Sequence, residues 1–263
     1  MTGQINNQRR TLSVLAILLA LAVSLMRPVM AENAIINPAE IPWKSIRLSS
    51  NQARAAFALA CKNAKASAVM KASFQSASDL LQKSGMGKKT ALLAEELAAL
   101  RFYTTEEGYA AINSFLRHPE KADKNGAFCL AVAQLMCSGL NKMPPSQRVS
   151  AKILYRGTVF PKGVGEKIYP KGTTVTHKAF TSTSVARYVA ESFADDGGAG
   201  GVGVIFRIRH SSGILISNFL DPEFWNYSEG EVLFRPYAKF AVVSIKPGSD
   251  DNAGWVLVDL QEK

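Results

Sequence analysis

Hydrophobic and polar residues change their spacing near residue 145 of the 263-residue chain. Before that point apolar residues recur every three or four positions, which is typical of amphipathic helices. The pattern predicts helices over residues 49–61, 70–83, 89–101, 104–116 and 126–140. Thr104 and Glu107 have the spacing of a capping box, so we expect Thr104 to cap the fourth helix. Pro144 and Pro145 end the last helix, because proline cannot continue its backbone hydrogen bonds.

After residue 145 short runs rich in Val, Ile, Phe and Thr alternate with Gly, Pro, Asp and Ser, a texture that predicts strands. The predicted strands cover residues 153–156, 174–183, 202–209, 214–217, 231–234, 240–245 and 255–260. Among them only residues 185–194 indicate a helix, and the glycine-rich stretch 195–201 indicates a loop. Helices followed by strands predict an α+β fold.

The first 31 residues have the features of an export signal. Arg9 and Arg10 precede an uncharged apolar run, and Val29-Met30-Ala31 offers small side chains to a signal peptidase. The run is shorter than the roughly 20 residues that a membrane span needs, and an uncleaved anchor is the alternative. We therefore expect residues 1–31 to be cleaved and the mature protein to be secreted, into the periplasm or the extracellular space, with no stable membrane span.

The mature chain is then expected to have one domain. An N-terminal extension would cover residues 32–44, and the domain would cover residues 45–263, with a helical part over 45–148 and a β-core over 149–263.

Charge and cysteines narrow the possible partners. Loss of the signal removes three arginines and lowers the formal charge from +10 to +7, but no block of like charges appears, so we expect no nucleic-acid partner. Attraction to acidic ligands fits the basic balance. Export permits disulfides, and Cys61 could pair with Cys129 or Cys137, although three buried thiols are the simpler interpretation. The chain has no Cys-x-x-Cys motif or histidine cluster, so we expect no metal.

Two glutamates separated by one glycine lie at the start of a predicted strand. On an extended backbone Glu229 and Glu231 would point to the same side, roughly 6–7 Å apart, and could serve one site. One carboxylate could stabilise a developing cation while the other holds a basic nucleophile. By itself such a pair is more often a solvated strand edge, so its position relative to other motifs decides its interpretation.

Two further motifs precede the glutamates. Arg156 would lie at a strand end before Gly157, where it could offer a forked cation to a phosphate while the backbone approaches the ligand. A surface arginine in a turn is the alternative. Ser182-Thr183-Ser184 ends another predicted strand, and we expect Ser184 to cap the following helix, which leaves Ser182 and Thr183 to face or support a cleft.

In this order, Arg156, Ser182-Thr183-Ser184 and Glu229-Gly230-Glu231 resemble the Arg/Ser-Thr-Ser/Glu-x-Glu class of mono-ADP-ribosyltransferases, especially the bacterial exoenzyme and toxin branch. The segment from Leu100 to Arg117 is similar to the helical signature that precedes the catalytic strands in that family. The likeness covers roughly residues 45–261. It implies a helical part followed by a mixed or antiparallel β-sandwich, NAD as the co-substrate, and transfer of ADP-ribose to a protein arginine.

The resemblance also implies roles for the site residues. Arg156 would bind a phosphate of NAD, and the backbone of Gly157 would meet the nicotinamide carboxamide. Ser182 would orient the second glutamate, and Thr183 would help to hold its strand. Glu231 would bind the nicotinamide ribose and stabilise the positive charge that builds on it, as a fixed carboxylate can.

The remaining roles concern the acceptor side and the ring of nicotinamide. Glu229 would hold or activate the incoming nucleophile, and a carboxylate there suits a guanidinium. Phe193 would lie beside nicotinamide, with a core phenylalanine as the alternative, and Trp225 and Tyr227 would contact the target protein. The loop 195–201 lacks the arginine that some relatives carry there, which leaves Arg187 and Arg207 as candidates for a second phosphate contact.

Other functions fit the sequence less well. A serine hydrolase would need a Gly-x-Ser-x-Gly elbow and a triad histidine, and neither is recognisable around His118, His177 or His210. An NAD glycohydrolase would use water as the acceptor, and a catalytically inactive binding module would keep the fold without the chemistry. Besides the target protein, a delivery or activator partner is conceivable for this family.

Overall fold

The computed structural model describes residues 37–84, 90–121, 125–162, 167–195, 201–217, 230–248 and 254–263. Residues Asn37–Lys263 form one compact unit. The predicted export signal lies outside the described residues, as do Trp225, Tyr227 and Glu229.

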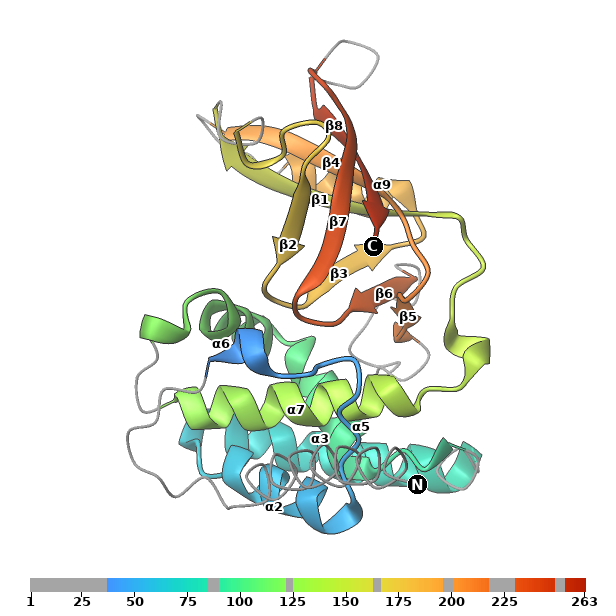
Figure 1. The fold of residues 1–263 in the computed structure, drawn as a ribbon. Helices are drawn as coiled ribbons and strands as arrows, with labels where there is room; N and C mark the ends of the chain where they lie inside the picture. Colours follow the sequence, from blue (N-terminus) through green and yellow to red (C-terminus); the bar gives the residue numbers. More distant parts are fainter. Residues whose placement is uncertain are drawn as a thin grey trace, which may run out of the picture. The chain divides into compact units, whose positions relative to one another are not determined.

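Helices make up the first part of this unit (Figure 1). The described α-helices are α2 (Ser50–Ala60), α3 (Ala64–Ser84), α5 (Ala94–Tyr103), α6 (Glu106–Arg117), α7 (Gly126–Lys142) and, between the strands, α9 (Arg187–Asp195), with short 3-10 turns η1 (Pro38–Glu40), η2 (Pro119–Lys121) and η3 (Pro145–Gln147). The helices predicted before residue 145 are all present with shifted ends. Buried residues cover most of α5 and α7, so these two helices form the centre of the helical core.

The predicted cap of α6 is wrong by one residue. Thr105 is the N-cap, and its Oγ1 accepts a hydrogen bond from the backbone N–H of Gly108 at 3.1 Å. Thr104 instead ends α5, where its hydroxyl donates to the carbonyl of Arg101 at 2.7 Å. Thr105 serves both helix ends, because its hydroxyl donates to the carbonyl of Phe102 at 2.8 Å while it accepts from the N–H of Gly108.

The described strands form one eight-stranded sheet with the order β2-β7-β8-β4-β1-β3-β6-β5. The strands are β1 (Ile153–Pro161), β2 (Thr174–His177), β3 (Thr181–Ser184), β4 (Gly201–Arg209), β5 (Ile214–Leu215), β6 (Glu231–Phe234), β7 (Ala238–Lys246) and β8 (Val256–Glu262). Neighbours are antiparallel except β4 and β8, which are parallel. The single strand predicted over 174–183 is wrong: β2 pairs with β7, whereas β3 pairs with β1 and β6.

The sheet folds back on itself. Phe234 of β6 and Phe240 of β7 have ring centroids 5.4 Å apart, although their strands stand near opposite ends of the sheet order. A second buried cluster gathers apolar side chains of β1, β4, β6, β7 and β8 between the two halves. The predicted α+β fold with a β-sandwich core is therefore confirmed.

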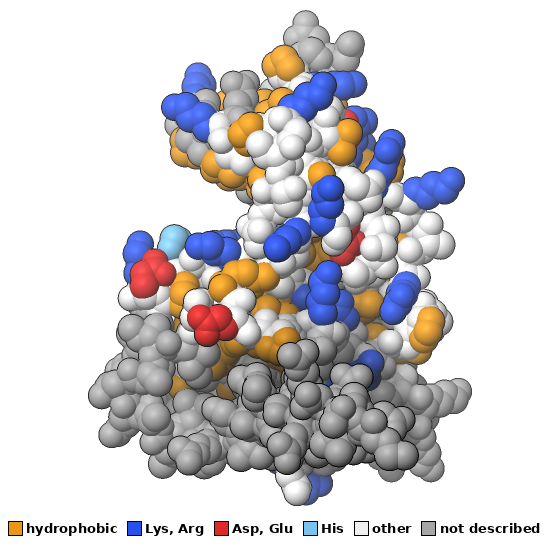
Figure 2. All heavy atoms as spheres, in the orientation of Figure 1, with side chains coloured by type: hydrophobic (Ala, Val, Ile, Leu, Met, Phe, Trp, Pro, Cys, Tyr) orange, Lys and Arg blue, Asp and Glu red, His pale blue; other side chains and the backbone are white. Residues whose placement is uncertain are grey.

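The surface in Figure 2 carries lysine and arginine side chains that are spread over the visible face and form no single block there. Cys129 and Cys137 are buried, Cys61 is partly buried, and none of these three forms a disulfide. Among the helices that the structure describes, none combines the length and the apolar character that crossing a bilayer requires.

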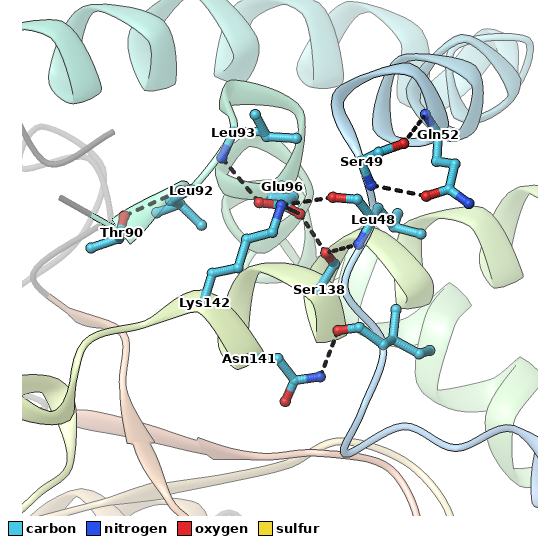
Figure 3. Close-up of polar contacts among 11 residues, drawn as sticks. Leu48, Ser49, Gln52, Thr90, Leu92, Leu93, Glu96, Ser138, Asn141 and Lys142 are labelled. Atoms are coloured by element: carbon cyan, nitrogen blue, oxygen red, sulfur yellow. Dashed lines mark hydrogen bonds and ion pairs between the residues drawn. The ribbon is translucent and has the colours of Figure 1, made fainter. Parts of the chain in front are cut away.

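A buried ionic network joins the first described segment to the helical core (Figure 3). Glu96 of α5 accepts hydrogen bonds at 2.7 Å from Lys142 Nζ, at 2.5 Å from Ser138 Oγ, both on α7, and at 3.0 Å from the N–H of Leu93. Lys142 also donates to the carbonyl of Leu48 at 2.9 Å. The side chain of Glu96 has no exposure and that of Lys142 is 8% exposed, so each charge depends on the other for compensation.

The substitution Lys142→Met should therefore destabilise the fold, because it leaves the Glu96 carboxylate buried without its cation. We expect a loss of about 3 kcal/mol in the free energy of unfolding, measured by urea denaturation of the full chain followed by circular dichroism. Lys152→Met makes the same replacement at an exposed position and should change stability by less than about 0.5 kcal/mol. Equal effects of the two variants would contradict the role of the ion pair.

Candidate active site

The site is built where two strands diverge. β1 pairs with β4 from Ile153 to Pro161, but it pairs with β3 only where Tyr155 faces Ser184. After Tyr155, the edge of β1 that faces away from β4 therefore has no partner among the described strands. A pocket of about 450 Å³ opens along this edge, a size typical of small-molecule sites.

Three parts of the fold line the pocket. The turn between α5 and α6 supplies one wall, β1 and β3 with the start of β6 supply another, and α9 supplies the third. The lining residues are Tyr103, Thr104, Thr105, Glu106, Tyr109, Tyr155, Arg156, Gly157, Thr158, Val159, Ser182, Thr183, Ser184, Val189, Ala190, Phe193 and Glu231. Arg156, Ser182 and Glu231, which the sequence places far apart, are thus brought into one pocket.

Arg156 lies within β1 and not at a strand end, which corrects the sequence-based expectation. Its Nη1 donates a hydrogen bond to the backbone carbonyl of Ser182 at 2.8 Å. This bond fixes the guanidinium against β3, on the open side of β1. The planar guanidinium carries further N–H donors in a rigid fork, which suits it to oxygen atoms of a phosphate.

Glu231 is oriented by a neighbouring strand. β3 and β6 pair with Ser184 opposite Glu231 and Ser182 opposite Leu233, so these side chains share one face. Ser182 Oγ donates to Glu231 Oε1 across the diagonal at 2.7 Å. On the opposite face Thr183 Oγ1 donates to the carbonyl of Val232 at 2.7 Å. The carboxylate is thereby held in one direction at the pocket.

Ser184 lies just before α9, as the predicted helix cap requires. Ser184 Oγ accepts from the N–H of Ala186 at 2.9 Å, but α9 begins only at Arg187. Ser184 therefore stabilises the turn that leads into the helix.

Two glycines of the site are required for packing. A Cβ on Gly157 would lie 1.7 Å from the carbonyl oxygen of Ala190, so α9 can lie against β1 only because this position has no side chain. Gly230 has a φ of +50°, and a Cβ there would lie 2.3 Å from Val185 Cγ2. The extended backbone assumed for residues 229–231 therefore does not hold at Gly230, and β6 begins at Glu231.

Two tyrosines beside the turn between α5 and α6, Tyr103 and Tyr109, line the pocket and were not predicted as site residues. Tyr103 is buried and its hydroxyl accepts from Asn113 Nδ2 at 3.0 Å; its burial and the nearby charge of Glu231 raise its pKa. Burial alone would raise the pKa of Tyr109, but the guanidinium groups of Arg156 and Arg117 together lower it. The positive charges of both arginines therefore act on the phenol of Tyr109. The signal was present in the helical signature that ends at Arg117.

Of the remaining candidate residues, Phe193 lines the pocket, whereas Arg187 and Arg207 are held by other side chains. Phe193 lines the pocket and is 56% exposed, so it is not a core phenylalanine. Arg207 is held by Asp259 through two hydrogen bonds of 2.7 Å, and Arg187 pairs with Glu191 at 2.8 Å. Both arginines are therefore engaged elsewhere. Within the described ranges no group of three or more His, Cys, Asp or Glu side chains could hold a metal ion.

The pocket thus brings together the arginine, the serine and the second glutamate on which the sequence resemblance to mono-ADP-ribosyltransferases rests. The family model of NAD:arginine ADP-ribosyltransferases matches residues 35–263, and the chain belongs to this family.

Individual relatives and structures agree with this assignment. The chain is 31% identical over 163 residues to the NAD(+)--protein-arginine ADP-ribosyltransferase Tre1 of Serratia proteamaculans (strain 568), a match that covers 62% of this chain and 32% of that protein. It is 32% identical over 171 residues to Mav of Mycobacterium avium (strain 104), described as an arginine ADP-ribosyltransferase, over 65% of this chain and 18% of that protein. The chain therefore spans less than a third of the length of these two relatives.

The fold is shared with solved structures of low sequence identity. The ADP-ribosyltransferase HopU1 of Pseudomonas syringae pv. tomato superposes with a TM-score of 0.64 at 17% identity, over 82% of this chain and 99% of that one. The type III effector XopAI of Xanthomonas axonopodis pv. citri superposes with a TM-score of 0.63 at 19% identity, over 84% of this chain and 86% of that one.

The close approach at Gly157 can be tested separately from backbone strain. Gly157→Ala should cost about 3 kcal/mol and should lower the protection of α9 in hydrogen exchange, because the new methyl group pushes the helix away from β1. Gly172→Ala is the matched control: its φ of +84° strains an alanine, but nothing lies within 4 Å of the added Cβ. We expect about 1 kcal/mol there and unchanged exchange in α9. The same exchange pattern in both variants would contradict the packing argument.

Proposed function

We propose that the chain is an exported NAD-dependent mono-ADP-ribosyltransferase that transfers ADP-ribose to an arginine of a target protein and releases nicotinamide. The observation that carries the proposal is the 2.7 Å hydrogen bond from Ser182 to Glu231 beside the strand-bound Arg156, all lining one pocket. The ADP-ribosyltransferase Vis, which has a related fold, has been solved in complex with agmatine, a guanidino compound, and this supports a guanidino acceptor.

The phosphates of NAD would be bound by the two arginines. Arg156 is fixed to β3, and Arg117, the last residue of α6, lowers the pKa of Tyr109 together with Arg156. Charge-assisted hydrogen bonds from guanidinium groups to phosphate oxygens are short and strong. The nicotinamide end would lie between Phe193 on α9 and the open edge of β1 at Gly157.

Glu231 would act on the bond that breaks. When the bond between the ribose and the nicotinamide nitrogen breaks, its electron pair leaves with nicotinamide and positive charge builds on the ribose. A carboxylate already oriented by Ser182 stabilises that charge without having to reorganise. Tyr103, whose hydroxyl is held by Asn113, closes the side of the pocket next to Glu231.

The acceptor side belongs to residues outside the described ranges. Glu229 would hold the acceptor guanidinium and take the proton that its nitrogen loses as it bonds to the ribose. Trp225 and Tyr227 would contact the target protein. We further propose that residues 1–31 direct export, that an extension over 32–44 precedes a domain over 45–263, and that the target lies in or beyond the periplasm, reached with a delivery or activator partner where one is needed.

Two glutamate variants separate bond breaking from transfer. Glu231→Gln keeps the size of the side chain but removes its charge, so NAD consumption and label transfer to agmatine should both fall at least about 100-fold. Glu229→Gln should lose transfer and keep much of the NAD hydrolysis, because water needs no guanidinium site. Both are measured with labelled NAD, nicotinamide release and labelled agmatine.

The control for these variants is Glu120→Gln, which removes an exposed charge of η2 and should leave both rates unchanged. A wild-type chain that neither consumes NAD nor transfers label would contradict the proposal and favour a binding module. Hydrolysis without transfer to any guanidino acceptor would identify an NAD glycohydrolase.

Arg117 provides a test of phosphate binding. Arg117→Ala should raise the KM for NAD by about 10- to 100-fold with little change in kcat, because a charge-assisted hydrogen bond contributes about 1.5–3 kcal/mol to binding. Lys121→Ala, which removes an exposed cation in the neighbouring η2 turn, is the control and should keep the wild-type KM. A KM that rises equally in both variants would indicate general attraction and no specific contact.

A further inference from the structure

His177 is a half-buried polar residue that does not line the pocket. It is the last residue of β2, and its ring packs among Tyr169, Phe206 and Phe240 inside the sandwich, with centroid distances of 6.1, 6.4 and 4.9 Å. Both ring nitrogens have hydroxyl neighbours. Nδ1 lies 3.1 Å from Thr181 Oγ1, and Nε2 lies 3.1 Å from the hydroxyl of Tyr169.

His177 lies at a corner of the sheet. Residues 178–180 lead from β2, which pairs with β7, to β3, which pairs with β1 and β6, so they form the corner between the two halves of the sheet. The imidazole spans this corner and bonds to Thr181, the first residue of β3. It therefore ties the start of β3 to the strand before it.

The bond from His177 adds to the contacts that hold the start of β3. All four residues of β3 pair with β6, but only Ser184 pairs with β1. The residue after Thr181 is Ser182, whose carbonyl accepts from Arg156 and whose hydroxyl donates to Glu231. A small shift of Thr181 would move the anchors of both pocket side chains at once.

We propose that His177 is a positioning residue of this transferase, which holds Thr181 and thereby fixes the Ser182 that orients Arg156 and Glu231. The inference rests on the proposed function. The positioning role requires a neutral His177 ring, in which one nitrogen donates a hydrogen bond and the other accepts one. Because a hydroxyl can both donate and accept, the hydroxyls of Thr181 and Tyr169 fit either tautomer.

The surroundings keep the ring neutral. Removal from water among the aromatic rings, with the added positive charges of Arg156 and Arg117, lowers the pKa of His177 to about 3. Burial raises the pKa of the Tyr169 hydroxyl, so that group stays protonated. Below the ordinary histidine pKa the unfolded chain binds a proton that the folded chain does not, so the fold loses stability as the pH falls from about 6.5 toward 3.

Substitutions of Thr181 and His177 test the proposed role with little change in side-chain shape. Thr181→Val removes the hydroxyl, and His177→Phe removes both ring nitrogens while filling the space. Both should lower kcat for NAD consumption by about 10- to 100-fold and leave the KM within about 2-fold, because the carboxylate is misplaced and the phosphate contacts remain. Thr181→Ser keeps the hydroxyl and should retain the wild-type kcat. Thr176→Val, at an exposed position of β2, is the control and should also retain it.

Nitrogen NMR of the imidazole gives a readout that does not depend on activity. The ring of His177 should stay neutral between about pH 8 and about pH 5. Its nitrogen shifts should change in Thr181→Val and not in Thr176→Val.

The outcomes separate the two proposals. An active wild type whose Thr181→Val and His177→Phe variants keep their kcat and lose only thermal stability would overturn the positioning role, as would a ring that titrates near 6.5. A wild type without any NAD consumption would contradict the proposed function, and the positioning role with it.

Discussion

The antiparallel register between β3 and β6 is the constraint on which the site depends. It places Ser182 and Glu231 on the face toward the helices and Val232 on the face toward the sandwich core. The bond from Thr183 to the carbonyl of Val232 locks this register from the other side. A slip of one residue would bury the Glu231 carboxylate among the apolar side chains of the sandwich and would remove Val232 and Phe234 from that core, which makes the register costly to change.

The helical part completes the site through a shared core. Leu233 and Phe180 belong to the same buried cluster as α5 and α7, and the ring of Phe180 packs 5.3 Å from that of Tyr103. The wall of the pocket formed by α5 and α6 is therefore set by packing against the two strands that carry the polar groups. The buried Glu96–Lys142 pair in turn fixes α5 against α7. Stability and pocket geometry are thus parts of one arrangement.

The sequence predicted local features better than neighbours in space. Helix periods gave the α-helices, and β6 has the predicted bounds, because both depend on adjacent residues. The run 174–183 was predicted as one strand because its composition is continuous, while the pairing partners that divide it lie far along the chain. The joint effect of Arg117 and Arg156 on Tyr109 was not predictable for the same reason, because it depends on tertiary packing. Motif order brought Arg156, Ser182 and Glu231 to attention, but only the fold supplies the bonds between them.

The divergence of β1 from β3 leaves peptide groups of β1 at the wall of a pocket, where a sheet would normally continue. A strand edge presents alternating donors and acceptors in a fixed plane, and it is selective for any planar group that carries one of each. The carboxamide of nicotinamide is such a group, so in the proposed complex the leaving group would stand in for the strand that is missing. Release of nicotinamide would then reopen the edge, and the same backbone would be ready to accept the next dinucleotide without any movement of the sheet.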